Sequence, residues 1–205
     1  MELGVPDIIK WFELANEKIQ HHKDYLTALD RPIGDGDHGI NMARGYQEAV
    51  NKIMAKSYTE PSEVLKDASM ALLAKVGGAS GPLYGTAFLK MSVAVKGHEV
   101  LSLATLAKGV EAGLTGLKQR GKSDVGEKTL VDVWNPVVEY ITGEEFCSDG
   151  LIEIIREAIE SSKDTMATKG RAAYFKEKSI GHIDPGSASS FYIFEALAEV
   201  MKEKE

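Results

Sequence analysis

The sequence predicts an all-α protein. Apolar residues recur at three- and four-residue spacing through about eight stretches, and none of the chain shows the convincing apolar–polar alternation of a half-buried strand. The 205 residues are 43% hydrophobic, which is enough apolar material to bury one sizeable core. Because no linker, low-complexity run or internal repeat separates two halves, residues 1–205 are expected to form one helical domain.

The expected helices follow one another along the whole chain. Their apolar spacing places them at residues 5–28, 40–56, 61–75, 83–96, 102–119, 129–143, 149–168 and 187–203. Ser148 and Asp149 are candidate N-caps for the seventh helix. Pro136 falls inside the sixth, so this helix is expected either to kink there or to begin later than its apolar spacing indicates.

Composition argues against two classes of partner. A formal net charge of -7 is opposite to the basic face that nucleic-acid binding requires. The longest uncharged run, Val76 to Leu89, is too short to span a membrane. The N-terminus shows no basic-then-apolar signal, and the single cysteine, Cys147, cannot form an internal disulfide. We therefore expect a cytoplasmic protein that binds neither nucleic acid nor membrane.

Three carboxylates near the N-terminus are the strongest functional signal. Asp30 precedes Asp35 and Asp37, and the latter two lie in the run GDGDHG at residues 34–39. Alternating acid and glycine favours neither helix nor core strand, and the acids repel one another unless a cation lies among them. Because Mg²⁺ prefers carboxylate, water and phosphate oxygens, the run predicts a site for a metal and a phosphate.

Other interpretations of this run are weaker. The run fits G-x-G-x-x-G, but a dinucleotide fingerprint needs a preceding strand, and bare acids would repel a pyrophosphate. A calcium loop of the EF-hand type that starts at Asp35 would need glycine where Ile40 stands and glutamate where Tyr46 stands. A solvated acidic turn stays open as an alternative, since Asp and Gly are also ordinary turn residues.

Three more glycine-punctuated clusters lie between the expected helices. Residues 77–82 read GGASGP, and there glycines allow close backbone approach to a ligand while Ser80 offers a hydroxyl. Residues 121–132 include Lys128 and Asp132, for which we favour a structural role over phosphate contact. Residues 169–186 include Arg171, whose planar fork suits a phosphate. His38 is either a ligand donor or a surface imidazole.

These clusters together suit phosphoryl transfer, in which catalysis is mostly positioning and neutralisation of charge. The acid triplet, the glycine-rich cradle and the cationic fork supply those parts, but no general base stands out among them.

At these residues the chain resembles a known family, the ADP-binding L subunits of bacterial dihydroxyacetone kinases. The resemblance runs from the first helix to Met201, with five strings in family order, and five ordered strings are far more specific than one. They are Asp30 with residues 34–39, residues 77–82, residues 128–129, residues 169–172 and residues 184–186. The resemblance implies an eight-helix up-and-down antiparallel barrel that holds a nucleotide and two Mg²⁺ ions in the loops at one end.

The resemblance also implies the residues of the site. Asp30, Asp35 and Asp37 would hold the metal ions, and Arg171 would join them as a catalytic residue. The nucleotide would be surrounded by His38, Gly39, Ile40, Asn41, Ala79, Ser80, Gly121, Leu130, Arg171, Asp184, Pro185 and Gly186. Glu127, where the family usually has Asp, and Ser187-Ala188, where Ala-Thr is more common, depart from the pattern near the nucleotide but leave the acids intact.

The implied reaction transfers the γ-phosphoryl group of bound ATP to dihydroxyacetone, which a separate K subunit holds covalently on its own histidine. ADP would stay bound and be rephosphorylated by a phosphohistidine M subunit of the phosphotransferase system. That division of labour explains the missing base. Two alternatives stay open: an ATP-exchanging kinase domain of the fatty acid kinase type, and a non-catalytic regulator that binds magnesium and nucleotide. A homodimer is also left open.

Overall fold

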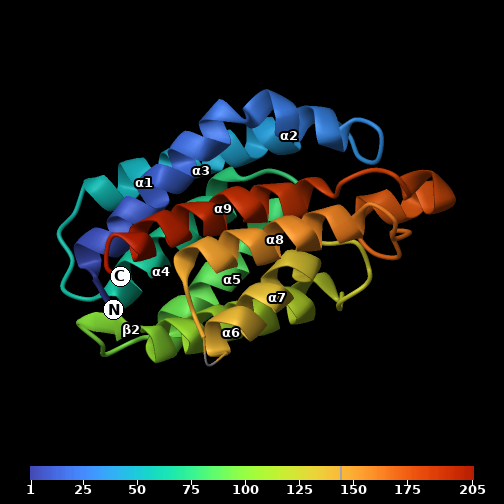
Figure 1. Cartoon of the computed structure of the whole chain (residues 1–205). Helices are drawn as coiled ribbons and strands as arrows, with labels where there is room; N and C mark the ends of the chain where they lie inside the picture. The colour runs from blue at the N-terminus through green and yellow to red at the C-terminus, as the bar shows by residue number, and fades with distance from the viewer. Residues whose placement is uncertain (144) are drawn as a thin grey trace.

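Helices form most of the computed structural model, which describes residues 1–143 and 145–205 (Figure 1). The elements in chain order are β1 (Glu2–Gly4), α1 (Val5–His21), α2 (Lys23–Asp30), α3 (His38–Met54), α4 (Pro61–Lys75), α5 (Ser80–Ala94), β2 (Val100–Ser102), α6 (Leu103–Gly121), α7 (Val131–Thr142), α8 (Ser148–Ser162), the 3-10 helix η1 (Arg171–Ser179) and α9 (Pro185–Lys202). The all-α prediction is confirmed.

The structure corrects the sequence-based expectations in four places. The N-cap of α8 is Cys147, in place of the expected Ser148 or Asp149. The first expected helix is two helices, because the backbone leaves the helical region at His22, whose ring stacks on Tyr192 with the centroids 4.2 Å apart. Two short strands, which periodicity did not predict, pair antiparallel with Leu3 opposite Leu101. The seventh expected helix ends at Ser162, and η1 follows it. Pro136 lies inside α7.

The long helices form a closed ring of contacts. From α3 to α9, each α-helix packs against the next in chain order, α1 packs against α3, and α9 returns to pack against α1. The short helix α2 continues α1 and packs against α3 and α9. In Figure 1 the long helices run in roughly one direction, so their ends gather at two opposite ends of the molecule.

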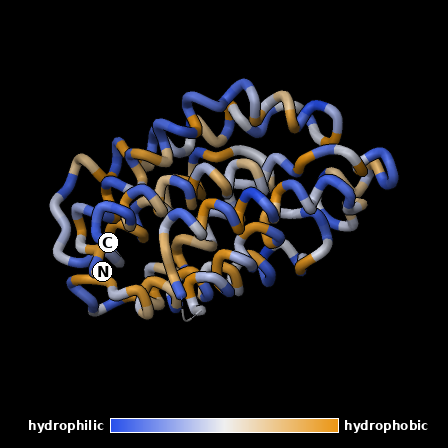
Figure 2. The backbone as a smooth tube through the Cα atoms, in the orientation of Figure 1, coloured by the Kyte–Doolittle hydropathy of each residue, from blue (hydrophilic) through white to orange (hydrophobic). Residues whose placement is uncertain are grey.

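Aromatic side chains fill the inside of the ring. Phe88 of α5 lies at the centre, with its ring centroid 5.0 Å from that of Phe12 and 6.3 Å from that of Trp134, and Trp134 continues to Phe194 at 4.8 Å. Each such pair contributes on the order of 1 kcal/mol beyond the burial of its apolar area. Hydrophobic residues recur along the helices among hydrophilic ones, as Figure 2 shows, because most helices turn one face inward, whereas α9 is buried on most of its surface.

The glycine-punctuated segments gather at one end of the ring. The segments after α2, between α6 and α7, and between α8 and α9 lie at the right of Figure 1, and both chain termini lie at the left. Within the described residues, every helix is too short or too polar to cross a bilayer.

Candidate functional site

One cleft brings the four clusters together. Its walls come from the loop after α2, the start of α5, the segment before α7 and the segment between α8 and α9. Of the residues that the sequence singled out, those that line the cleft are Asp30, Asp35, Asp37, His38, Asn41, Ala79, Ser80, Gly121, Leu130, Arg171, Asp184, Pro185 and Gly186. Gly39 and Ile40 do not: Gly39 packs against the backbone of α2, and Ile40 points to solvent.

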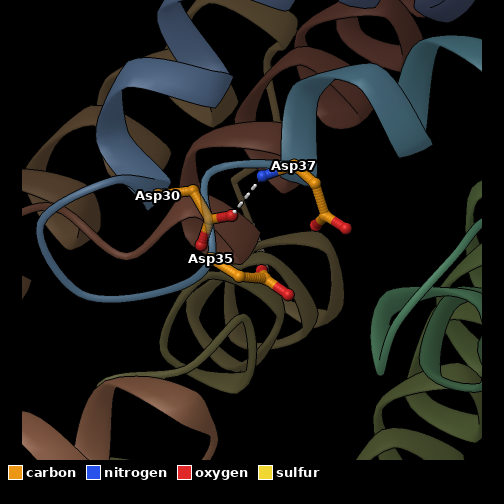
Figure 3. A group of neighbouring side chains, drawn as sticks. All are labelled: Asp30, Asp35 and Asp37. Carbon is orange, nitrogen blue, oxygen red and sulfur yellow. Dashed lines mark hydrogen bonds between the residues drawn. The ribbon is translucent and has the colours of Figure 1, made fainter.

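The three carboxylates converge on one point of the cleft (Figure 3). Each offers an oxygen within 4.8 Å of the others, which is close to twice the Mg–O distance of about 2.1 Å. Asp30 is buried and accepts hydrogen bonds from the backbone N–H groups of Asp37, at 2.9 Å, and His38, at 3.1 Å. Asp35 and Asp37 are exposed. The oxygen-only donor set fits hard divalent cations such as Mg²⁺.

Glycine at position 34 makes this arrangement possible. A β-carbon there would lie 1.8 Å from Oδ1 of Asp30, so any other residue would displace the carboxylate. Gly36 adopts a φ of 73°, in the left-handed region that side chains disfavour. The alternation of glycine and acid is therefore a geometric requirement of the loop, which explains why the motif was informative at the level of sequence.

Three helices begin at the cleft. His38, Ser80 and Pro185 are the first residues of α3, α5 and α9, and all three line it. A helix N-terminus presents unpaired backbone N–H groups and the positive end of the helix dipole. The convergence of three such ends beside the carboxylates gives the cleft donors for phosphate oxygens next to ligands for a metal.

His38 is a buried bridge, which excludes the second of its two interpretations, a surface imidazole. Its Nδ1 lies 3.2 Å from the hydroxyl of Ser80, and its Nε2 lies 2.9 Å from the hydroxyl of Ser189. Burial lowers the pKa of His38 to about 4, so the ring is neutral near pH 7.

Asp184 caps α9 at the cleft wall. Its Oδ2 accepts from the backbone N–H of Ser187 at 2.7 Å and from the Ser187 hydroxyl at 3.2 Å. Burial raises the pKa of Asp184 to about 6, against the effect of these two donors. The Asp184 carboxylate therefore fixes the turn that leads into α9.

Arg171 reaches the carboxylates from the far side of the cleft. Its Nη1 lies 2.8 Å from Oδ2 of Asp35. Gly170, with a φ of 67°, turns the chain into η1 and aims the guanidinium at the loop after α2. A contact between segments so distant in sequence could not be read from either motif alone.

Lys128 has the structural role that we favoured. Its side chain is 1% exposed, and Nζ donates to the carbonyls of Ser162 at 2.9 Å, Lys163 at 3.2 Å and Thr165 at 2.9 Å. These carbonyls lie at the C-terminal end of α8 and just after it, where a positive charge is stabilised by the helix dipole and by unpaired carbonyl groups. Asp132 also holds local backbone, since its carboxylate accepts from the N–H groups of Gly126 and Thr129.

Sequence reasoning missed several residues of the site. Ile33, Leu83 and Ser123 line the cleft, and Tyr84 and Ser189 lie behind it in a buried hydrogen-bond network. The available signal was the run of serines at 187, 189 and 190 in the first turns of α9, because buried hydroxyls need partners.

Comparison with known proteins gives the family. The model of the DAK2 domain matches residues 32–199. The chain is 48% identical to the PEP-dependent dihydroxyacetone kinase 1, ADP-binding subunit DhaL, of Listeria innocua, over 93% of this chain and 94% of that protein. It is 46% identical to the PTS-dependent dihydroxyacetone kinase, ADP-binding subunit DhaL, of Lactococcus lactis, over 97% and 99%.

A solved structure shares the fold. The dihydroxyacetone kinase from C. freundii in complex with AMP-PNP and Mg²⁺ superposes with a TM-score of 0.73 at 21% identity, over 94% of this chain and 33% of that one. This chain therefore spans about a third of that kinase. The motifs, the all-helical ring and the relatives agree: the chain belongs to the DAK2 domain family and, within it, to the L subunits of bacterial dihydroxyacetone kinase.

Proposed function

We propose that this chain binds ADP or ATP with two Mg²⁺ ions in the cleft and passes the γ-phosphoryl group to dihydroxyacetone. The acceptor is held covalently on a histidine of a separate K subunit, and ADP is rephosphorylated in place by a phosphohistidine M subunit. The relatives, which are ADP-binding subunits of PEP- or PTS-dependent dihydroxyacetone kinases, support this proposal. Residues 1–205 act as one nucleotide-binding domain, since the ring of helices closes on itself.

The observation that carries the proposal is the acid triplet beside three helix N-termini. Asp30, Asp35 and Asp37 hold the metal ions, which when bound neutralise the polyphosphate and orient it for in-line transfer. Backbone N–H groups in the first turns of α3, α5 and α9, other than those of His38 and Ser187, which donate to Asp30 and Asp184, are placed to donate to phosphate oxygens.

Arg171 is placed to contact the transferred group. Its guanidinium already lies at the carboxylates, and its side chain is 55% exposed, so it can turn from Asp35 to a phosphate oxygen at little cost. A planar fork binds phosphate through two parallel hydrogen bonds, which a lysine cannot do. Stabilising the charge that develops in the transition state is the role we assign to it.

The cleft does not supply the base for the reaction. Among the described residues that line it, His38 is the one imidazole, and both of its ring nitrogens are engaged with serine hydroxyls. During transfer the bond from the γ-phosphorus to the β–γ bridging oxygen breaks and a bond to the acceptor hydroxyl oxygen forms. The acceptor's proton therefore goes to a group on the K subunit, whose docking closes the reaction site.

The test is reconstitution with purified partners. The chain, the K subunit and dihydroxyacetone are combined either with ATP alone, or with ADP, the M subunit and a source of phosphohistidine, and dihydroxyacetone phosphate is measured. The proposal expects product in the second mixture at a catalytic, not stoichiometric, amount of ADP. Product that forms only with excess ATP would favour the exchanging type of kinase, and no product in either mixture would contradict the proposed function.

A further inference from the structure

A buried polar network lies behind the cleft wall. Tyr84 of α5 is its centre: the phenol oxygen lies 2.7 Å from the hydroxyl of Ser189 and 2.8 Å from that of Ser190, and it donates to the carbonyl of Gly186 at 2.9 Å. Ser189 continues the network to Nε2 of His38 at 2.9 Å. His38 in turn reaches the Ser80 hydroxyl through Nδ1 at 3.2 Å.

The network joins the three helices that begin at the cleft. His38 starts α3 and Ser80 starts α5, while Gly186 and Ser189 lie in the first turns of α9. Of these residues, His38, Ser80 and Gly186 line the cleft, whereas Tyr84 and Ser189 are fully buried. The buried pair therefore contacts groups on the cleft surface without reaching the cleft itself.

Buried hydrogen bonds of this kind fix the orientation of the groups that they join. In a low-dielectric interior, an oriented hydrogen-bond chain is stronger than in water, and breaking one link leaves a buried partner unsatisfied. His38 has two neutral tautomers, and the protonated nitrogen is set by the hydrogen bond that the other nitrogen makes. Ser189, itself fixed by Tyr84, thus determines the orientation and tautomer of His38, and His38 determines where the Ser80 hydroxyl points.

We propose that Tyr84 and Ser189 are positioning residues for nucleotide binding, which act through His38 to fix the Ser80 hydroxyl at the wall of the cleft. This inference rests on the proposed function, because it takes the nucleotide as the ligand of that wall. The network also holds the carbonyl of Gly186, so the same two side chains fix the first turn of α9.

The first experiment compares two tyrosines that differ in their hydroxyl partners. Tyr84→Phe removes the centre of the network and keeps the buried ring. Tyr46→Phe is the matched control, because Tyr46 is also fully buried and its hydroxyl has no hydrogen-bond partner among the residues that the structure describes. Calorimetry with MgADP is expected to show about tenfold weaker binding by Tyr84→Phe, the effect of one lost hydrogen bond, and unchanged binding by Tyr46→Phe.

The second experiment measures the tautomer of His38 by NMR. The ¹⁵N chemical shifts of its ring nitrogens report which one carries the proton. Wild-type protein is expected to show one tautomer without nucleotide, and both Tyr84→Phe and Ser189→Ala are expected to change the ratio of tautomers while the helical circular dichroism stays the same. Tyr46→Phe leaves the His38 signals unchanged.

A double-mutant cycle tests whether Tyr84 affects nucleotide binding through Ser80. If Tyr84 acts through Ser80, then Tyr84→Phe weakens MgADP binding less in a Ser80→Ala background than in wild type, although the two side chains do not touch. Additive effects would overturn the proposal, as would unaltered His38 shifts in both network variants or loss of the helical signal in both. If wild-type protein itself binds no MgADP, the proposed function is wrong, whereas normal binding by both variants contradicts the positioning role alone.

Discussion

The guanidinium of Arg171 contacts the carboxylate of Asp35, with Nη1 and Oδ2 2.8 Å apart. The contact joins the loop after α2 to the start of η1 and puts a proposed phosphate ligand beside a proposed metal ligand. Both side chains are about half exposed, so the ion pair itself adds little to stability. Its importance lies in placing an exposed guanidinium beside the proposed position of the transferred phosphoryl group.

Arg171→Ala is expected to lower phosphoryl transfer about 100-fold, the usual effect of removing one donor to a transition-state charge. The free energy of unfolding is expected to change by less than about 0.5 kcal/mol, because the pair is solvent-exposed. Steady-state assays and thermal unfolding check the two parts. Arg171→Lys should recover only part of the rate, since lysine lacks the fork; full recovery would show that charge alone is required.

Substitution of the three aspartates is expected to affect transfer alike but stability differently. Asp35→Ala and Asp37→Ala should abolish transfer and leave unfolding within about 0.5 kcal/mol of wild type, because both side chains are exposed. Asp30→Ala should also destabilise the protein by about 2 kcal/mol, since it removes a buried acceptor of two backbone N–H groups. Denaturant titrations measure the difference. Equal destabilisation by all three would mean that the loop is merely structural.

Lys128→Ala is expected to destabilise the fold by about 3 kcal/mol. The change removes a buried ammonium and leaves three carbonyls at the end of α8 without their shared donor. Lys108→Ala, on an exposed position of α6, is the control and should have no measurable effect. Urea unfolding of the two variants is the measurement. If Lys128→Ala unfolds like wild type but binds MgADP poorly, the structural role assigned to Lys128 is wrong.

Asp184 is expected to make stability depend on pH. Its pKa is about 6 in the folded protein and near 3.9 in the unfolded chain, so between about pH 4 and 6 the folded state keeps a proton that the unfolded state has released. Raising the pH through this window therefore lowers the free energy of unfolding. Asp184→Asn keeps a side-chain cap and does not titrate.

Comparison of wild type with Asp184→Asn isolates the effect that titration of the Asp184 carboxyl group has on stability. Unfolding of wild type and Asp184→Asn is measured from pH 4 to pH 7, and wild type should lose stability relative to the variant as the pH rises to about 6, with no further relative change above it. A relative gain of wild-type stability over the same range would show that the carboxyl is favoured in its charged form by the fold.

Local sequence patterns predicted the features that depend on local geometry, namely most of the helices and the loop of the acid triplet. The apolar spacing gave most helices to within a few residues, and the glycine–acid run marked the loop that brings Asp30, Asp35 and Asp37 together, because Gly34 has to be glycine beside Asp30. The helix break at His22 was missed, since it accompanies a stacking contact with Tyr192, far away in the sequence. The strands β1 and β2 were missed for a similar reason: three residues are too few to show alternation.

Features that depend on tertiary contacts could not be predicted from the same patterns. The sequence left His38 open between a ligand donor and a loop imidazole, because only the packing of α3 against α9 buries it against Ser189. The family resemblance implied that Gly39 and Ile40 surround the nucleotide, but the helical turn directs them away from the cleft.

The most direct test of the account is a calorimetric titration of nucleotide-stripped, refolded protein with ADP, in the presence and absence of Mg²⁺. The account predicts binding that requires Mg²⁺ and that is lost in Asp35→Ala and Asp37→Ala, while Tyr46→Phe binds as wild type does. Absence of binding by helical wild-type protein, or equal affinity with and without Mg²⁺, would contradict the claim that the three aspartates join magnesium to a polyphosphate.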